Sequence, residues 1–515
     1  MSPPMPHDSD KGKIEATEIG QLPAVKPAVQ SEWPLALDLS HHLSVESRSR
    51  EKSLLKLSTS YLTGDSELLS LAAGLPSVSL FPIEKIAVSA PTPKPATAAG
   101  RSEGVWRGDG LLSDLNQLLM EKDGKAKGYT NYDLSNALQY EQGTGAKDLL
   151  KFVKEHTKIV HNPKYSDWDC ILTGGNTHAM ETVFRMILNP GQGFIVEQYG
   201  FPETFEALRS LQIKLFGVEV DDEGMRADSL RELLSTWDVE VRGLERPRAI
   251  YLVPTGQNPT GATMSLERRK AIYEVAVEQD LLIVEDDPYY FLQMSEYVPG
   301  SDFQTVNVPK LNSEFLQTLV PSMLSIDTQG RVIRLDSFSK VIAPGMRCGW
   351  ITSSARFIER ILRHNEVGLQ FPSGMSTAVL HSILQNSWGQ EGYLDWLVNL
   401  RAEYTSRRNA LLCAMDTYLP KEFCHWVVPS AGMFVWIKVD HTKHPHHHRG
   451  ISAIEVELFH ASIANKVLIL PGAWFKVAEA DATGVYFRAT FASVSPENMM
   501  TAIKRFGEVL NCAFR

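Results

Sequence analysis

The chain has 515 residues, of which 43% are hydrophobic and 22% charged, enough apolar sequence for a large core and more than one domain. A formal net charge of −10 without a basic stripe argues against general nucleic-acid binding. No apolar run reaches membrane-spanning length, and the N-terminal residues lack the apolar core of a signal peptide. The five scattered cysteines indicate reduced thiols rather than a disulfide framework. These features favour a soluble cytoplasmic protein without membrane or nucleic-acid partners.

The composition and the hydrophobic periodicity change along the chain. Residues 1–34 are rich in Pro, Ser, Asp and Lys without periodicity, which predicts a disordered leader. The Pro- and Ala-rich stretch 91–104 predicts a surface loop. From about residue 130 to 355, apolar runs alternate with helical patterns, which predicts an α/β fold with a mostly parallel sheet covered by helices. The seven runs are 170–172, 194–196, 214–220, 249–253, 281–284, 332–335 and 348–352.

A glycine turn follows the first of these runs. Residues 173–177 (TGGNT) lead into a helical pattern with apolar residues on one face. That face carries Met180, Val183, Phe184 and Ile187. Glycines let the backbone approach an anion closely, and the N-terminus of a helix favours negative charge. We therefore expect a phosphate near Asn176 and Thr177, although a Gly-Gly turn alone is a weak signal.

An acidic pair follows the fifth run. Asp286 and Asp287 come shortly after residues 281–284 (LLIV), and Tyr289 lies three residues beyond Asp286. A carboxylate at a strand end can keep a pyridine nitrogen protonated, and a phenol can hydrogen-bond an oxygen on the same ring. The alternative is that Asp286 caps a helix and Tyr289 belongs to the core.

A lysine lies among hydroxyl residues after the sixth run. Residues 332–335 indicate a buried strand, so the Lys340 amine is delivered to the crevice where α/β sheets bind ligands. An amine in that position can condense with an aldehyde. The flanking Ser337 and Ser339, together with Arg347, suit a phosphate, so the best-matched aldehyde is pyridoxal 5'-phosphate. On spacing alone, a surface lysine after a strand is the alternative.

The stretch 441–448 (HTKHPHHH) contains imidazoles that could bind zinc or nickel. It has no cysteine or carboxylate partners at fixed spacing. We expect a solvated loop there, and no metal at the functional site.

The segments around Gly175, Asp286 and Lys340 together resemble the class I and II aminotransferases, pyridoxal-phosphate enzymes of fold type I in the aspartate aminotransferase superfamily. Other matching stretches occur in the right order: 70–76 (SLAAGLP), 138–140 (LQY), 258–261 (NPTG), 431–436 (AGMFVW), 471–472 (PG) and 487–491 (FRATF). The resemblance covers roughly residues 40–510. It looks closest to the fungal aromatic amino acid aminotransferases and to kynurenine/α-aminoadipate aminotransferase. Residues 38–48 (DLSHHLSVESR) look like the N-terminal signature of the fungal group.

The resemblance implies a domain organisation. A large cofactor-binding domain with a seven-stranded sheet would span 105–365, and a smaller α+β domain would span 366–515. Residues 35–104 would form an N-terminal arm and part of the smaller domain. Because Tyr140 would reach the cofactor phosphate of a second subunit, the resemblance also implies a homodimer.

The resemblance further assigns roles in cofactor binding. Lys340 would bind the cofactor aldehyde and then move the substrate proton, while Asp286 would support the ring nitrogen. Tyr289 and Asn258 would bond the ring oxygen. The implied phosphate ligands are Asn176, Thr177, Ser337, Ser339, Arg347 and Tyr140. Phe201 stands where relatives usually carry a tyrosine stacked on the ring, and Tyr199 is the alternative stacking residue.

Substrate recognition by resemblance begins with Arg488, whose planar fork suits an α-carboxylate. Gly74 would let that carboxylate approach the backbone, and Asn258 would also contact the substrate. Lys56 stands where the kynurenine/α-aminoadipate enzymes have an arginine. It would either bind a distal carboxylate or simply be solvated.

The implied activity is transfer of the amino group of an aromatic L-amino acid (Phe, Tyr or Trp) to 2-oxoglutarate or another oxo acid. A preference for α-aminoadipate or kynurenine is the alternative. A remote alternative is a transcription regulator that contains an aminotransferase-like domain. Residues 1–95 argue against it because they show no basic helix-turn-helix pattern.

Overall fold

The computed structural model describes residues 33–53, 71, 74–93, 105–106, 115–122, 133–300, 303–477 and 482–515. Among these residues, no helix is both long enough and apolar enough to cross a membrane. The predicted leader at 1–34 and the predicted loop at 91–104 lie mostly outside the described residues.

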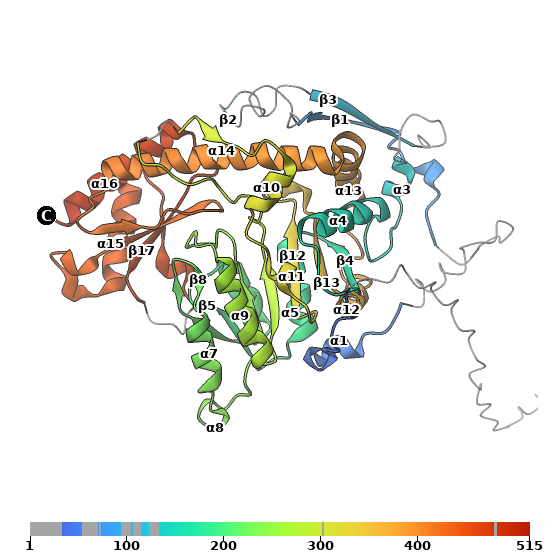
Figure 1. Cartoon of the computed structure of the whole chain (residues 1–515), viewed down its shortest axis with the longest axis horizontal. Coiled ribbons are helices and arrows are strands. Elements are labelled where there is room, and N and C mark those ends of the chain that lie inside the picture. Colours follow the sequence, from blue (N-terminus) through green and yellow to red (C-terminus); the bar gives the residue numbers. More distant parts are fainter. Residues whose placement is uncertain are drawn as a thin grey trace, which may run out of the picture.

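A seven-stranded sheet with the order β4-β13-β12-β10-β9-β5-β6 forms the centre of the molecule (Figure 1). Its strands are β4 (Trp168–Thr173), β5 (Gly193–Glu197), β6 (Lys214–Val218), β9 (Ala249–Leu252), β10 (Leu282–Asp286), β12 (Val332–Ser337) and β13 (Gly349–Ser354). The strands pair in parallel, except that β13 runs antiparallel to β12 and β4. Each of the seven apolar runs overlaps one of these strands, so the predicted α/β fold with a mostly parallel sheet is confirmed.

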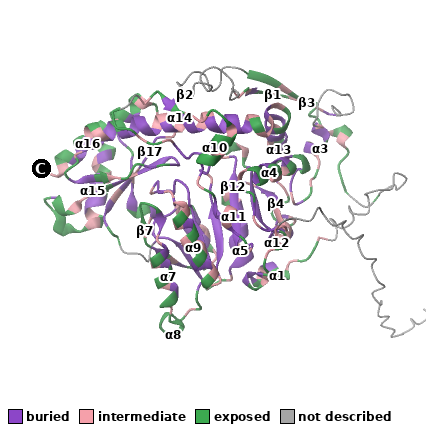
Figure 2. Ribbon diagram, in the orientation of Figure 1, coloured by how far each residue is buried: buried purple, intermediate pink, exposed green. Residues whose placement is uncertain are grey.

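Helices cover both faces of this sheet, because every second side chain of a strand points to the opposite face. One face packs against α5 (Asn176–Ile187), α6 (Pro202–Ser210) and α12 (Ala355–Asn365). The other packs against α4 (Lys147–Val160), α7 (Ala227–Ser235), α9 (Leu266–Glu278), α10 (Asn312–Thr318) and α11 (Met323–Ile326). The apolar face predicted for α5 is buried against the sheet. Figure 2 shows the buried strands between helices whose outer surfaces are exposed.

The C-terminal part of the chain builds a second sheet of four strands in the order β14-β15-β17-β16. These are β14 (Cys424–Trp426), β15 (Phe434–Val439), β16 (Leu470–Pro471) and β17 (Val485–Thr490), and they pack with α15 (Ile451–Ala464) and α16 (Pro496–Ala513). The long helix α14 (Gly389–Tyr418) connects the two sheets (Figure 1). Its first half packs in a core beside the large sheet, and its second half packs in the core of the small one.

Residues 33–53 lie against the large sheet. They contain a 3-10 turn, η1 (Ser40–His42), and the short helix α1 (Val45–Ser49). The Ser44 N–H donates to the Met186 carbonyl at 2.8 Å, and Leu39 and Leu43 join the core beneath α5. These buried leucines therefore face the core of the large sheet. The assignment of residues 35–104 to an N-terminal arm and part of the smaller domain stays a prediction.

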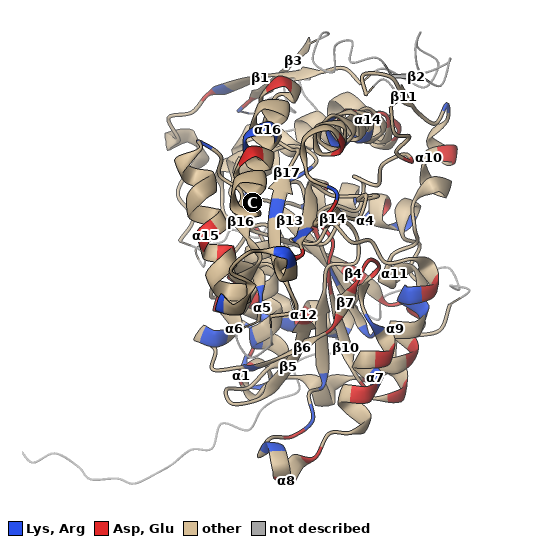
Figure 3. Ribbon diagram, turned by 90° about the vertical axis from the view of Figure 1, so that its left-hand side faces the viewer, with Lys and Arg blue, Asp and Glu red and all other residues tan. Residues whose placement is uncertain are grey.

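The remaining elements are short. Three two-stranded sheets pair β1 (Lys85–Pro91) with β3 (Leu115–Glu121), β2 (Val105–Trp106) with β11 (Val306–Asn307), and β7 (Val220–Asp221) with β8 (Gly224–Met225). The short helices are α3 (Leu134–Leu138), α8 (Val239–Arg242) and α13 (Gly374–His381), and a π-helical turn η5 (Ser382–Trp388) leads into α14. The 3-10 turns are η3 (Val78–Leu80), η4 (Pro344–Met346), η6 (His441–Lys443), η7 (His447–Arg449) and η8 (Gly472–Phe475). Figure 3 shows acidic residues on α7 and α9, in keeping with the net negative charge.

One arginine holds three acids in the interior, on the sheet face away from α5. Arg334 lies 3.0 Å from Glu285, 3.2 Å from Asp287 and 2.9 Å from Asp336, and all four side chains are buried. Burial raises the pKa of Asp287 to about 7 and that of Asp336 to about 6, and Arg334 opposes both shifts. Removing the guanidinium would leave these acids with an uncompensated cost of burial.

We therefore expect Arg334→Met to lower the free energy of unfolding by about 3–5 kcal/mol, because it breaks a buried ion-pair network. The control is Arg226→Met, which removes an exposed pair with Asp228 and should cost at most about 1 kcal/mol. Urea denaturation followed by circular dichroism measures both. Equal unfolding midpoints for the two variants would contradict this interpretation.

Candidate active site

A cavity of about 320 Å³ opens at the carboxyl edge of the large sheet, beside β15 and β17 of the smaller sheet. Many residues predicted from the sequence line it: Asn176, Thr177, Phe201, Asn258, Asp286, Tyr289, Ser337, Ser339, Lys340, Arg347 and Arg488. The cavity is also lined by residues to which the sequence analysis gave no role in the site: Met180, Tyr251, Val253, Pro288, Pro344 and Phe434.

One end of the cavity is suited to an anion. Gly175 precedes α5 with a φ of +89°, and a Cβ atom there would come within 2.7 Å of Arg347 Nη2. No side chain caps the first turn of α5, so its backbone N–H groups are available to a ligand. Arg347 Nη1 donates to Ser339 Oγ at 3.4 Å, and Ser337 Oγ donates to the same oxygen at 2.8 Å. A guanidinium, two hydroxyls and a helix N-terminus thus meet here.

The carboxylate of Asp286 lies at the end of β10, on the α5 side of the sheet. The Tyr251 hydroxyl donates to Asp286 Oδ2 at 2.6 Å, and Asn176 Nδ2 donates to Oδ1 at 2.6 Å. Burial raises the pKa of Asp286, while these two hydrogen bonds oppose the rise. The Asn176 side chain therefore supports the carboxylate rather than the anion end. Only the backbone of Asn176 remains for the phosphate role expected from the sequence.

Lys340 follows β12 and faces the same cavity. Burial lowers the pKa of its amine and Arg347 acts in the same direction, whereas Asp286 opposes both. An amine that loses its proton more readily is a better nucleophile toward a carbonyl carbon. Asp287 is not part of this arrangement, because it points to the opposite face and contacts Arg334.

Arg488 brings the smaller sheet into the site. It lies on β17, and its Nη1 donates to Asn258 Oδ1 at 2.7 Å. Its guanidinium stacks between the rings of Phe434 and Phe475, at 4.4 and 4.5 Å from their centroids. Burial lowers the pKa of Arg488, and Tyr289 opposes this shift. The guanidinium is therefore a positioned cation at the boundary between the two sheets.

Phe201, and not Tyr199, lies in the cavity. The Tyr199 hydroxyl pairs with Thr483 Oγ1 at 3.1 Å, and its ring contacts Trp436 and Tyr486. Tyr199 lines a separate, larger cleft of about 570 Å³ that contains neither Lys340 nor Asp286. The position expected to carry the stacking ring is therefore occupied by a phenylalanine.

Two expected residues are not in this cavity, and a third lies outside the described residues. Gly74 and Tyr140 do not line it and are exposed, and Gln139 Nε2 donates to the Pro76 carbonyl at 2.8 Å, which joins their two segments. Lys56 lies outside the described residues. The His-rich stretch 441–448 is largely exposed, and within the described part of the chain it brings no three metal-ligating atoms together.

Tyr251 is the main residue that the sequence analysis missed. It lies in β9, within an apolar run that indicates a core strand, and it is paired in register with Val284 of β10. The signal was a hydroxyl inside that run, which needs a partner when it is buried. Asp286 is that partner.

The residues present fit an aromatic aldehyde that carries a phosphate, together with an amino acid. The donor set offers a nucleophilic amine, a carboxylate beside it, and hydroxyls and a guanidinium at the anion end. Asn176 Oδ1 is buried without a hydrogen-bond partner in the described structure, so the pocket retains unsatisfied polar capacity. Arg488 is left to meet a substrate carboxylate.

Comparison with known proteins assigns the family. Residues 111–506 match the family described as aminotransferase class I and II. An aromatic amino acid aminotransferase of Schizosaccharomyces pombe is 41% identical over 93% of this chain and 98% of its own length. The kynurenine/alpha-aminoadipate aminotransferase of Bos taurus is 31% identical over 92% of this chain and 99% of its own length. The chain belongs to the class I and II aminotransferases, as the sequence predicted, and is an enzyme of that class.

A solved structure agrees with this assignment. Aminotransferase Aro8 from Candida albicans superposes with a TM-score of 0.86 at 36% sequence identity, and the match covers 93% of this chain and 99% of that one. The predicted fold of type I aminotransferases is thereby confirmed.

We expect Tyr251→Phe to lower the turnover number about 10- to 100-fold, because a hydrogen bond to a charged group contributes about 1.5–3 kcal/mol. Loss of a donor to the charged form also raises the pKa of Asp286, so the acidic limb of the pH–activity profile should move to higher pH. The control is Tyr273→Phe, whose hydroxyl bonds Asp327 away from the cavity. An unshifted profile for Tyr251→Phe would refute the coupling to Asp286.

Proposed function

We propose that this enzyme uses pyridoxal 5'-phosphate to transfer the amino group of an aromatic L-amino acid to 2-oxoglutarate or another oxo acid. The observation that carries the proposal is that Lys340, Asp286, Arg347 and the first residues of α5 line one cavity. The names of relatives at 38–41% identity support the aromatic substrate class.

When bound, pyridoxal phosphate supplies an aldehyde and an electron-withdrawing ring. Lys340 would hold the aldehyde, and its amine would move a proton at the substrate α-carbon. Asp286, supported by Tyr251, would keep the ring nitrogen protonated. Tyr289 and Asn258 would bond the ring oxygen. The phosphate would be held by the first turn of α5 with Thr177, the hydroxyls of Ser337 and Ser339, and Arg347.

Arg488 binds the α-carboxylate that all amino and oxo acid substrates share. Because Phe434 and Phe475 flank the guanidinium and Phe201 also lines the cavity, an aromatic substrate side chain would find apolar partners. A preference for kynurenine or α-aminoadipate is the second candidate, supported by the 31% identical bovine relative. Screening the amino acids against several oxo acids separates the two.

The proposal includes a cytoplasmic homodimer in which Tyr140 serves the second subunit's site, while Gly74 lets the substrate α-carboxylate approach the backbone. Leu75 and Tyr140 are 52% and 58% exposed, and they lie on two segments that the hydrogen bond from Gln139 to Pro76 joins. A two-fold partner would cover them and would bring Tyr140 to the cofactor phosphate.

Replacing Lys340 by alanine tests the cofactor proposal. The purified wild-type protein should be yellow, and Lys340→Ala should lose both that absorbance and turnover, because among the described residues Lys340 is the one lysine that lines the cavity with Asp286. Lys421→Ala, which removes a surface pair with Asp416, is the matched control. Normal colour and turnover in Lys340→Ala would rule out the assigned role.

Two further variants test substrate recognition. Arg488→Ala should weaken all amino and oxo acids alike, by roughly 2–5 kcal/mol if the carboxylate pair is desolvated. Lys56→Ala should raise the KM for 2-oxoglutarate and leave phenylalanine nearly unchanged. Steady-state kinetics of both half-reactions measures these effects. A substrate-selective defect in Arg488→Ala would contradict the α-carboxylate role, and equal effects of Lys56→Ala on both substrates would contradict the distal one.

Mixing two inactive variants tests the dimer. If Tyr140 acts in the second subunit, a hybrid of Lys340→Ala and Tyr140→Ala chains contains one complete site, so the mixture should regain activity after subunit exchange. Each variant treated alone in the same way is the control. A mixture that never exceeds its components would show that Tyr140 does not act across an interface.

A further inference from the structure

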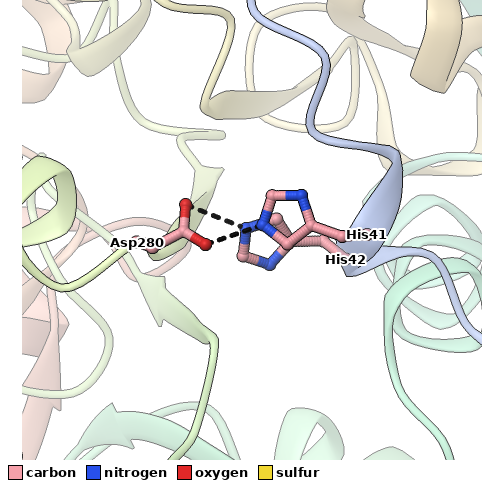
Figure 4. Close-up of side chains that lie close together, drawn as sticks. All are labelled: His41, His42 and Asp280. Atoms are coloured by element: carbon pink, nitrogen blue, oxygen red, sulfur yellow. Dashed lines mark hydrogen bonds and ion pairs between the residues drawn. The ribbon is translucent and has the colours of Figure 1, made fainter.

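Two imidazoles and a carboxylate meet just before the start of β10, at the opposite end of that strand from the cavity (Figure 4). His41 and His42 form the end of η1, and Asp280 lies in the turn between α9 and β10. His41 Nε2 is 2.6 Å from Asp280 Oδ2, and His42 Nε2 is 3.4 Å from Asp280 Oδ1. One ligand atom from each residue lies within 4.8 Å of the others.

This cluster is separate from the active site. Asp280 precedes β10, whereas Asp286 ends it. At about 3.3 Å per residue, six residues of extended chain place the two acids roughly 20 Å apart. The cluster therefore does not depend on the proposed cofactor or substrate.

His42 is the observation that points to a ligand. Its side chain is only 1% exposed, and within the described structure its Nε2 makes no hydrogen bond and has an ion-pair contact with Asp280 Oδ1 at 3.4 Å. A buried polar atom without a hydrogen bond is costly, and native structures usually supply one.

A neighbouring arginine holds the Asp280 carboxylate in place. Arg331 Nη1 donates to Asp280 Oδ1 at 2.8 Å, which leaves Oδ2 directed toward His41. Asp280 has a φ of +51°, in the left-handed region that aspartate tolerates. A carboxylate fixed by a neighbouring donor is a common support for a metal ligand. Asp280 and His41 are each 47% exposed, so an ion and a water can reach the cluster.

We propose that His41, His42 and Asp280 bind one divalent transition-metal ion such as zinc, with water completing a four-coordinate site. Two imidazoles and one carboxylate suit zinc, whereas calcium and magnesium prefer more oxygen ligands. Tetrahedral ligands lie about 3.3 Å apart. At 2.6 Å from Asp280 Oδ2, His41 Nε2 is closer than that, so its exposed ring has to move outward from Asp280. The bound ion ties residues 33–53 to the turn before β10.

Cobalt titration tests the site in the full-length protein saturated with pyridoxal phosphate. After dialysis against a chelator, Co²⁺ is added, and its visible absorption together with the metal content after gel filtration is measured. Wild type should bind one ion per chain with the intense visible band of a four-coordinate ion, and added Zn²⁺ should displace that band. Zn²⁺ should also raise the midpoint of thermal unfolding, because an ion that binds only the folded state stabilises it.

His41→Ala and Asp280→Asn are the test variants, since both side chains are partly exposed and asparagine tolerates the same backbone conformation. Each should lose the cobalt band and the zinc-dependent rise in the unfolding midpoint. The double variant His447→Ala/His448→Ala, in the His-rich loop, is the control and should keep both. A wild type that binds no cobalt, or a band that persists in the test variants and disappears in the control, would overturn the proposal. In the first case the cluster is only an imidazole–carboxylate pair.

Discussion

The alternation of side chains along β10 and β12 is the constraint on which the active site depends. Asp286 points to the α5 side of the sheet, whereas Glu285 and Asp287 point to the other side, where Arg334 lies between them and Asp336. Four acids at neighbouring strand ends would otherwise repel one another in the interior. Arg334 pairs with the three acids on its own side of the sheet. Asp286 therefore remains separate from them and accepts hydrogen bonds from Tyr251 and Asn176.

That separation determines where the other functional groups lie. β12 runs parallel beside β10, so the turn that follows it carries Lys340 to the same edge as Asp286. Asn176 both begins α5 and donates to Asp286, which couples the anion end of the cavity to the carboxylate. The hydrogen bond from Arg488 to Asn258 joins the smaller sheet to this edge. Movement of one sheet relative to the other would therefore change the position of Arg488, the residue proposed to bind the substrate carboxylate.

The sequence predicted features in which a chemical group directly follows an apolar run. The seven strands, Lys340 and Asp286 were recognisable in this way, because a buried parallel strand is a short apolar run and its carboxyl end is where ligands bind. Features that depend on register or on distant contacts were not predictable. Tyr251 reaches Asp286 only because β9 and β10 pair as they do, and His41 meets Asp280 across 239 residues of chain. The side-chain direction of Asn176 likewise follows from the tertiary structure.

A crystal structure of the protein grown with pyridoxal phosphate tests the central claim most directly. The account predicts electron density continuous from Lys340 Nζ to the cofactor, with the ring nitrogen within hydrogen-bond distance of Asp286 and the phosphate at the first turn of α5. Density joined to a different lysine, or a cofactor seated in the larger cleft beside Tyr199, would contradict it.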